Sequence, residues 1–108
     1  MLKVLIIEDE APAAKRLEKM LTEIEPGSQV LDTIVSVTSA VKWFRENSSP
    51  DLVLSDIQLS DGISFEIFRQ VETDCPVIFI TAFDQYAIDA FKVNSIDYLL
   101  KPVKKNEL

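Results

Sequence analysis

Short runs of apolar residues alternate along the chain with longer segments in which apolar residues recur every three or four positions. Three short runs, at 4–7, 52–54 and 77–80, are almost continuously apolar. Such runs are typical of inner strands in a parallel sheet that helices cover on both faces. Two further runs, at 30–35 and 96–100, contain polar residues and indicate edge strands. The pattern therefore predicts five strands.

The segments between these runs predict helices. An apolar stripe extends from 13 to 24, with Pro12 near its first turn and Pro26 and Gly27 after its end. Three further helices are predicted around 40–44, 65–71 and 87–91. Each follows a residue that favours a helix N-terminus, respectively Thr38, Asp61 and Asp84. Strands that alternate with helices predict an α/β fold.

The two polar runs also predict the order of the strands. If they are the edges, the simplest arrangement is a doubly wound, flavodoxin-like parallel sheet of five strands in the order 2-1-3-4-5. Its winding reverses between strands one and three, and ligands of such sheets bind at the carboxyl ends of strands beside the reversal. Residues 103–108 resemble the first turn of a fifth helix, which we expect to be truncated.

Composition narrows the class of protein. The chain has 108 residues, 47% of them hydrophobic, which fits a single domain over 1–108. A formal net charge of -7 argues against binding of nucleic acid or an anionic membrane by this chain. No run of about 18 apolar residues and no cleavable leader are visible, so we expect a cytoplasmic protein. The single cysteine, Cys75, has no partner for a disulfide and is predicted to be a small buried residue.

Acidic residues follow two of the predicted inner strands. Glu8 and Asp9 come directly after the run 4–7, and Asp56 comes shortly after 52–54. Two carboxylates about 4 Å apart repel by roughly 4 kcal/mol at an effective dielectric constant near 20, so such a group calls for a cation. Oxygen ligands without histidine select a hard ion, and the set suits Mg²⁺.

A hydroxyl group and an ammonium group follow the other two strands at this edge. Thr81 comes after 77–80, and Lys101 comes after 96–100. Both side chains can bind phosphoryl oxygens opposite the carboxylates. A single acidic residue after a strand is more often a helix cap, but the set of five at strand ends favours phosphoryl chemistry.

Four motifs resemble those of response-regulator receiver domains in two-component signalling. They are LIIEDE at 5–10, SDIQLSDG at 55–62, TA at 81–82 and KP at 101–102. The resemblance spans the whole chain. It implies a phosphoacceptor signalling domain, not an enzyme with a separate substrate, that receives its phosphoryl group from a sensor histidine kinase.

Carried over to matching positions, the resemblance implies a role for each residue of the site. Asp56 would be phosphorylated, and Mg²⁺ would be bound by Asp9, Asp56 and the backbone carbonyl of Gln58. Glu8 would bind the metal through water. The phosphoryl oxygens would contact Thr81 and Lys101. Tyr98 is either a switch residue that moves with Thr81 or a half-buried tyrosine of an edge strand.

The sequence departs from the family pattern at two positions. Ser60 stands where proline is common, and Glu8 stands where aspartate is commoner. Residues 83–102 resemble receivers that are attached to LytTR-type DNA-binding domains. This resemblance implies a transcription regulator whose output domain is not present in this chain, so any DNA binding would come from that missing domain. A homodimer through the fourth helix and fifth strand is a further expectation.

Two other classes of protein compete with this interpretation. A phosphohydrolase of the haloacid-dehalogenase type also uses an aspartate at a strand end beside Mg²⁺, but its general acid would stand at Gln58, which cannot transfer a proton. A flavodoxin-like cofactor protein needs phosphate-binding donors in its first loop, where Glu8, Asp9 and Glu10 would repel phosphate.

Overall fold

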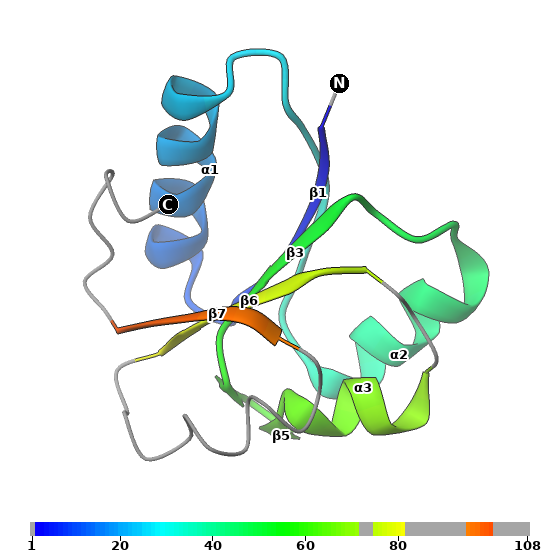
Figure 1. Ribbon diagram of the computed structural model, residues 1–108. Helices are drawn as coiled ribbons and strands as arrows, with labels where there is room; N and C mark the ends of the chain where they lie inside the picture. Colours follow the sequence, from blue (N-terminus) through cyan, green and yellow to red (C-terminus); the bar gives the residue numbers. More distant parts are fainter. Residues whose placement is uncertain (1, 72–74, 82–94, 101–108) are drawn as a thin grey trace.

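A parallel sheet of five strands forms the centre of the computed structural model, which describes residues 2–71, 75–81 and 95–100 (Figure 1). The strands are β1 (Lys3–Ile7), β2 (Gln29–Ile34), β3 (Leu52–Ser55), β6 (Val77–Thr81) and β7 (Ser95–Leu100). Their order is β2-β1-β3-β6-β7. All four pairs are parallel, so the predicted order and the two predicted edges are confirmed.

Strand β1 shows why the inner runs are continuously apolar. Leu5 and Ile7 belong to one buried cluster, whereas Val4 and Ile6 belong to a second. All four side chains are fully buried. Because side chains alternate across a strand, the two clusters lie on opposite faces of the sheet. A strand covered on both faces needs apolar residues at every position.

The helices divide between these two faces (Figure 1). Helix α1 (Ala11–Ile24) supplies Leu17 and Leu21 to the cluster that contains Val4 and Ile6. Helices α2 (Val37–Glu46) and α3 (Phe65–Gln70) contribute to the other cluster. Helix α1 starts beside Pro12 and ends before Pro26, as predicted. The longest helix in the described part of the chain has 14 residues, and none there is long and apolar enough to cross a membrane.

Helix α2 begins two residues earlier than an N-cap at Thr38 predicts. Its N-cap is Ser36, whose side-chain oxygen accepts a hydrogen bond from the Ser39 N–H at 3.1 Å. The predicted fourth helix and the expected truncated fifth helix lie outside the described residues.

A small antiparallel hairpin between β3 and α3 was not predicted. It consists of β4 (Gln58–Leu59) and β5 (Gly62–Ile63), in which Gln58 pairs with Ile63 and Leu59 with Gly62. Two-residue strands are too short to produce a recognisable period in the sequence. Gly62 has a φ of 153°, which lies in the region that favours glycine.

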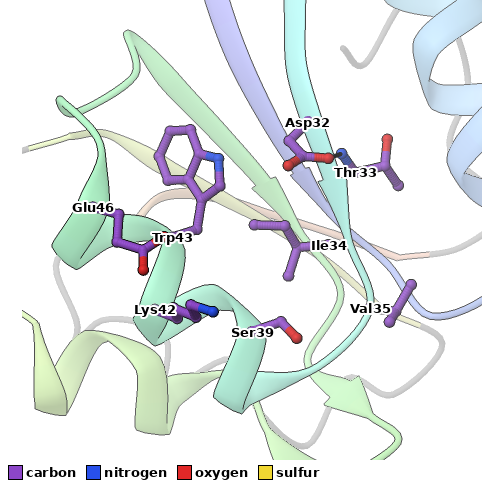
Figure 2. A pocket seen from close by; sticks show the side chains of 8 residues that line it. All are labelled: Asp32, Thr33, Ile34, Val35, Ser39, Lys42, Trp43 and Glu46. Carbon is purple, nitrogen blue, oxygen red and sulfur yellow. Dashed lines mark hydrogen bonds between the residues drawn. The ribbon is translucent and has the colours of Figure 1, made fainter.

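The exposed edge of the sheet at β2 is protected in two ways. The Asp32 carboxylate accepts a hydrogen bond from the Thr33 N–H at 2.8 Å, so this donor is not open to a further strand. The register with β1 also shifts, between Val4 and Leu5. Such devices discourage pairing with other chains. A hollow of about 280 Å³ lies beside this edge. Figure 2 shows residues that line it, with Asp32 and Ile34 of β2 facing Trp43 of α2.

Cys75 precedes β6 and is 7% exposed. Its thiol is free. The prediction of a small buried cysteine is therefore confirmed.

Candidate functional site

The carboxyl ends of β1 and β3 bring two acidic residues to the same edge of the sheet. Ile7 at the end of β1 pairs with Ser55 at the end of β3. The next residues are Glu8 and Asp56, and the Asp56 N–H donates a hydrogen bond to the Ile7 carbonyl at 2.8 Å. Glu8 and Asp56 therefore follow neighbouring strands at the same level, beside the point where the winding reverses.

Glu8 is held firmly at this edge. Only 1% of the residue is exposed. Its N–H donates to the Ile34 carbonyl of β2 at 2.8 Å, and its Oε1 accepts a hydrogen bond from the Glu10 N–H at 3.3 Å. A buried carboxylate is costly unless it is hydrogen-bonded or close to a cation. The burial of Glu8 therefore favours a role for its carboxylate in binding a hydrogen-bond donor or a cation.

Glu8 belongs to a group of three consecutive carboxylates. Glu8, Asp9 and Glu10 each offer one oxygen, and these oxygens all lie within 4.8 Å of one another. Asp9 and Glu10 are exposed, whereas Glu8 is buried. Asp56 is not a member of this group. Glu10 was not among the predicted site residues. The unbroken run of three acidic residues after β1 could have indicated that it belongs to the same group of carboxylates.

Asp56 is buried as well, with 7% of the residue exposed. Its Oδ1 accepts a hydrogen bond from the Ile57 N–H at 2.7 Å. The Ser55 hydroxyl donates to the Asp56 carbonyl at 2.8 Å. The backbone and one carboxylate oxygen of Asp56 are thus fixed by neighbouring groups.

Gln58 lies two residues after Asp56, where the hairpin begins. The residue is exposed and stands at the start of β4. At the other end of this loop, the Ser64 N–H donates to the Ile57 carbonyl at 2.7 Å. This hydrogen bond closes the loop on Ile57, the residue after Asp56, so Gln58 lies at the start of a closed loop next to Asp56.

Thr81 occupies the carboxyl end of the next strand. Ser55 of β3 pairs with Phe79 of β6, so Thr81 stands two positions beyond the level of Ser55. Thr81 pairs with Leu100 of β7, and Lys101 directly follows Leu100 in the sequence.

The structure therefore describes two of the predicted residues on β6 and β7 by strand position only. Tyr98 of β7 pairs with Phe79. Lys101 lies outside the described residues. The roles of Thr81, Lys101 and Tyr98 stay predictions.

The donor chemistry at this edge fits a hard cation. The carboxylate oxygens of Glu8, Asp9 and Glu10 are the ligands that Mg²⁺ and similar ions prefer, and the sequence contains no histidine that would favour a softer metal. The hollow beside Trp43 is lined by none of these acidic residues and is a separate feature (Figure 2).

Comparisons with known proteins agree with this arrangement. The family model described as "Response regulator receiver domain" matches residues 4–108. The chain is 38% identical to "Sensory transduction protein LytT" of Bacillus anthracis, over 100% of this chain and 44% of that protein. It is 35% identical to "Positive alginate biosynthesis regulatory protein" of Pseudomonas aeruginosa, over 99% of this chain and 44% of that protein. The chain thus spans less than half the length of these curated relatives.

Solved structures have the same fold. The response regulatory domain of protein mrkE from Klebsiella pneumoniae matches with a TM-score of 0.86 at 24% identity, over 98% of this chain and 88% of that one. A response regulator receiver domain protein from Clostridium thermocellum matches with a TM-score of 0.82 at 31% identity, over 99% and 87%. The solved structures confirm the predicted flavodoxin-like fold. The family model and the relatives confirm the predicted resemblance to receivers of LytTR-type response regulators. The chain belongs to the response regulator receiver domain family.

Proposed function

We propose that this domain accepts a phosphoryl group on Asp56 from a phosphohistidine of a separate sensor histidine kinase. The observation that carries the proposal is the position of Asp56, which is buried at the carboxyl end of β3 and level with the buried Glu8 of β1. The chain contains no histidine, so the donor phosphohistidine must lie outside residues 1–108. A carboxylate at a winding reversal is well placed to meet such a donor.

In the transfer step, a carboxylate oxygen of Asp56 attacks the phosphorus atom. The bond between phosphorus and the donor imidazole nitrogen breaks, the imidazole leaves with the electron pair, and an acyl phosphate remains on Asp56. The Ile57 N–H holds the other oxygen in place, since it already binds Oδ1. Thr81 and Lys101 would bind the phosphoryl oxygens and stabilise their negative charge.

Mg²⁺ would be held by Asp9, Asp56 and the backbone carbonyl of Gln58, with Glu8 acting through water. The acidic group around Glu8 supports this assignment, because its oxygens suit a hard divalent cation. When bound, Mg²⁺ supplies positive charge that offsets the charge of the phosphoryl group and of the clustered carboxylates.

The phosphorylated domain would then switch an attached output domain. The curated relatives are more than twice as long as this chain, and one of them is named as a positive regulator of alginate biosynthesis. By analogy, residues 1–108 would be the receiver of a cytoplasmic transcription regulator whose further domain binds DNA. Thr81 and Tyr98 would carry the switch to the surface of the fourth helix and β7, through which two copies could pair.

A phosphohydrolase of the haloacid-dehalogenase type is the alternative. Gln58 stands where such an enzyme needs its general acid, and an amide cannot donate a proton to a leaving group. We therefore propose a signalling domain that promotes its own phosphorylation and dephosphorylation without turning over a separate substrate.

The test is to incubate the domain with Mg²⁺ and acetyl phosphate, to measure the intact mass, and to map the adduct. We expect one phosphoryl group on Asp56 and none in Asp56→Asn. Asp51→Asn is a matched control, because Asp51 precedes the opposite end of β3 and its Oδ2 accepts a hydrogen bond from the Lys3 N–H at 2.8 Å.

The proposal fails if Asp56→Asn gains a phosphoryl group at the same rate as the native chain. The alternative function is supported instead if the native chain releases many equivalents of phosphate from a phosphomonoester without keeping an adduct.

A further inference from the structure

Asp61, in the turn between β4 and β5, binds the start of helix α2. One carboxylate oxygen accepts a hydrogen bond from the Val37 N–H at 2.7 Å. The other accepts from the Thr38 N–H at 3.1 Å and from the Thr38 hydroxyl at 2.9 Å. The turn that follows the phosphoacceptor strand is therefore tied to a helix that precedes that strand in the sequence.

These bonds complete the cap of helix α2. The first N–H groups of a helix have no partner within the helix. The Ser36 side chain satisfies the Ser39 N–H, and the Ala40 N–H makes the first bond within the helix, to the Ser36 carbonyl at 3.1 Å. The two remaining donors, of Val37 and Thr38, are both satisfied by Asp61.

Electrostatics favour the same contact. The first turn of α2 contains no acidic residue, so Asp61 brings the negative charge that stabilises a helix N-terminus. The hydrogen bond from the Val37 N–H, together with those from Thr38, lowers the pKa of Asp61 below its ordinary value. The carboxylate is therefore ionised at neutral pH, the state in which it can accept all three hydrogen bonds.

Other contacts hold the turn against the same helix end. The Ser60 hydroxyl donates to the Val35 carbonyl at 3.4 Å. A methyl group on Gly62 would lie 3.8 Å from Cγ2 of Val37, so the turn packs directly on the first residue of α2. Since Gln58 pairs with Ile63 across this turn, a restraint on Asp61 also restrains Gln58.

Resting on the proposed function, we propose that Asp61 is a positioning residue. By tying the 57–63 loop to the N-terminus of α2, it holds the Gln58 carbonyl ready for Mg²⁺ beside Asp56. Without the tie the loop would have more conformations, and metal binding would have to order it. Loss of a helix cap of this kind corresponds to about a fivefold change in an equilibrium constant, so we expect Asp61→Ala to weaken Mg²⁺ binding about fivefold.

The experiment compares four single variants with the native chain. Asp61→Ala removes every bond of the tie, Asp61→Asn keeps one accepting oxygen, and Thr38→Val removes only the hydroxyl bond. Asp51→Asn is the matched control, since Asp51 also accepts a backbone N–H from a distant residue, but at the opposite end of the sheet. Calorimetry measures the affinity for Mg²⁺, and hydrogen exchange measures protection of the Val37 and Gln58 amides.

We expect the Mg²⁺ affinity to fall in the order native, Thr38→Val, Asp61→Asn, Asp61→Ala. Exchange at Gln58 should rise in the same order, and Asp51→Asn should match the native chain. Labelling by acetyl phosphate should slow about fivefold in Asp61→Ala at limiting Mg²⁺ and recover at saturating Mg²⁺, which a general loss of structure would not do.

The positioning role is overturned if Asp61→Ala binds Mg²⁺ as tightly as Asp51→Asn and its exchange at Gln58 is unchanged. If Asp61→Ala does not fold, the same result in Thr38→Val and Asp61→Asn overturns it. A failure of the proposed function gives a different result. The native chain would then take up no phosphoryl group at any Mg²⁺ concentration, whereas exchange at Gln58 would still decide whether Asp61 holds the loop.

Discussion

The carboxylate of Asp61 binds backbone groups that lie 23 and 24 residues earlier in the chain. The local sequence pattern instead placed Asp61 before the third helix, where acidic residues often act as caps. In the structure, the residue before α3 is Ser64, and its side chain makes no capping hydrogen bond. A hydrogen bond between distant segments leaves no trace in local spacing, so the role of Asp61 required the structure.

Unlike the role of Asp61, the positions of the acidic residues at the strand ends could be predicted from the sequence. Glu8 and Asp56 follow apolar runs directly or nearly so, and the carboxyl ends of neighbouring parallel strands share an edge. The close group of carboxylates in the structure contains Glu8, Asp9 and Glu10, and the Glu10 N–H donates a hydrogen bond to Glu8 Oε1 within it.

The buried thiol of Cys75 gives a prediction about alkaline pH. Burial, and secondarily the negative charge of Asp51, raises the pKa of Cys75 from 9.0 to about 11. The folded state therefore favours the neutral thiol, whereas the unfolded chain ionises near pH 9. The resulting stability is complete below pH 9 and declines between pH 9 and 11, by at most about 3 kcal/mol.

Urea unfolding of the native chain and of Cys75→Ala at pH 8 and pH 10.5 measures this effect. The alanine variant shares every other titrating group, so the difference between the two proteins isolates the thiol. We expect the native chain to lose more stability than Cys75→Ala over this interval. Equal losses in the two proteins would contradict the raised pKa.

At the scale of elements, burial decided what the sequence revealed. Strands β1, β3 and β6 contribute residues to both core clusters. Because both faces of these strands are buried, their residues are apolar at nearly every position, and the runs are easy to recognise in the sequence. The β4–β5 hairpin contributes Leu59 to the core and contacts α2 through its turn. Short strands of this kind carry no period, and Gly62 was the one local sign of a turn.

Gly62 gives a prediction at this scale. Its φ of 153° is costly for any residue with a side chain, whereas a methyl group would meet no atom closer than 3.8 Å. Gly62→Ala should therefore destabilise the fold through backbone strain, by about 1–2 kcal/mol. Gly27→Ala is the control, because a methyl group there would have no heavy atom within 4 Å and the backbone at Gly27 does not show a positive φ of this kind.

Thermal unfolding followed by circular dichroism separates the two glycine variants. We expect the Tm of Gly62→Ala to fall by about 4–8 °C for each kcal/mol lost, and the Tm of Gly27→Ala to stay equal or rise slightly. If both variants melt like the native chain, the turn tolerates a side chain and the strain argument is wrong.

At the scale of the whole molecule, the topology gathers charge at one edge. The order β2-β1-β3-β6-β7 reverses its winding between β1 and β3, and this is the place where Glu8 and Asp56 emerge side by side. Glu8 and Asp56 are part of a formal net charge of -7, so the buried carboxylates at this edge are repelled by an excess of negative charge in the whole chain. Folding tolerates this arrangement because β1 and β3 are fixed by the core on both faces of the sheet.

A cation at this edge should therefore stabilise the whole domain. A ligand that binds only the folded state contributes RT ln(1 + [L]/Kd), which is about 1.4 kcal/mol when Mg²⁺ is tenfold above its Kd. On the scale of about 4–8 °C per kcal/mol for a chain of this size, we expect the Tm to rise by about 6–11 °C at that Mg²⁺ concentration. Ca²⁺ should act similarly but less specifically, whereas the same ionic strength supplied by NaCl should have a much smaller effect, because screening alone leaves a buried charge unpaired.

Asp56→Asn tests whether this stabilisation comes from the proposed site. The neutral amide removes one buried charge at the edge of the sheet that also holds Glu8, so the metal-free variant should melt at a higher temperature than the metal-free native chain. The same change removes a ligand, so the further rise with Mg²⁺ should shrink. Asp51→Asn changes the net charge equally, at the opposite end of β3, and should keep the full response to Mg²⁺. A Mg²⁺ response that is the same in both variants would place the bound ion elsewhere on the acidic surface, since only one of the two substitutions touches the carboxyl edge of the sheet.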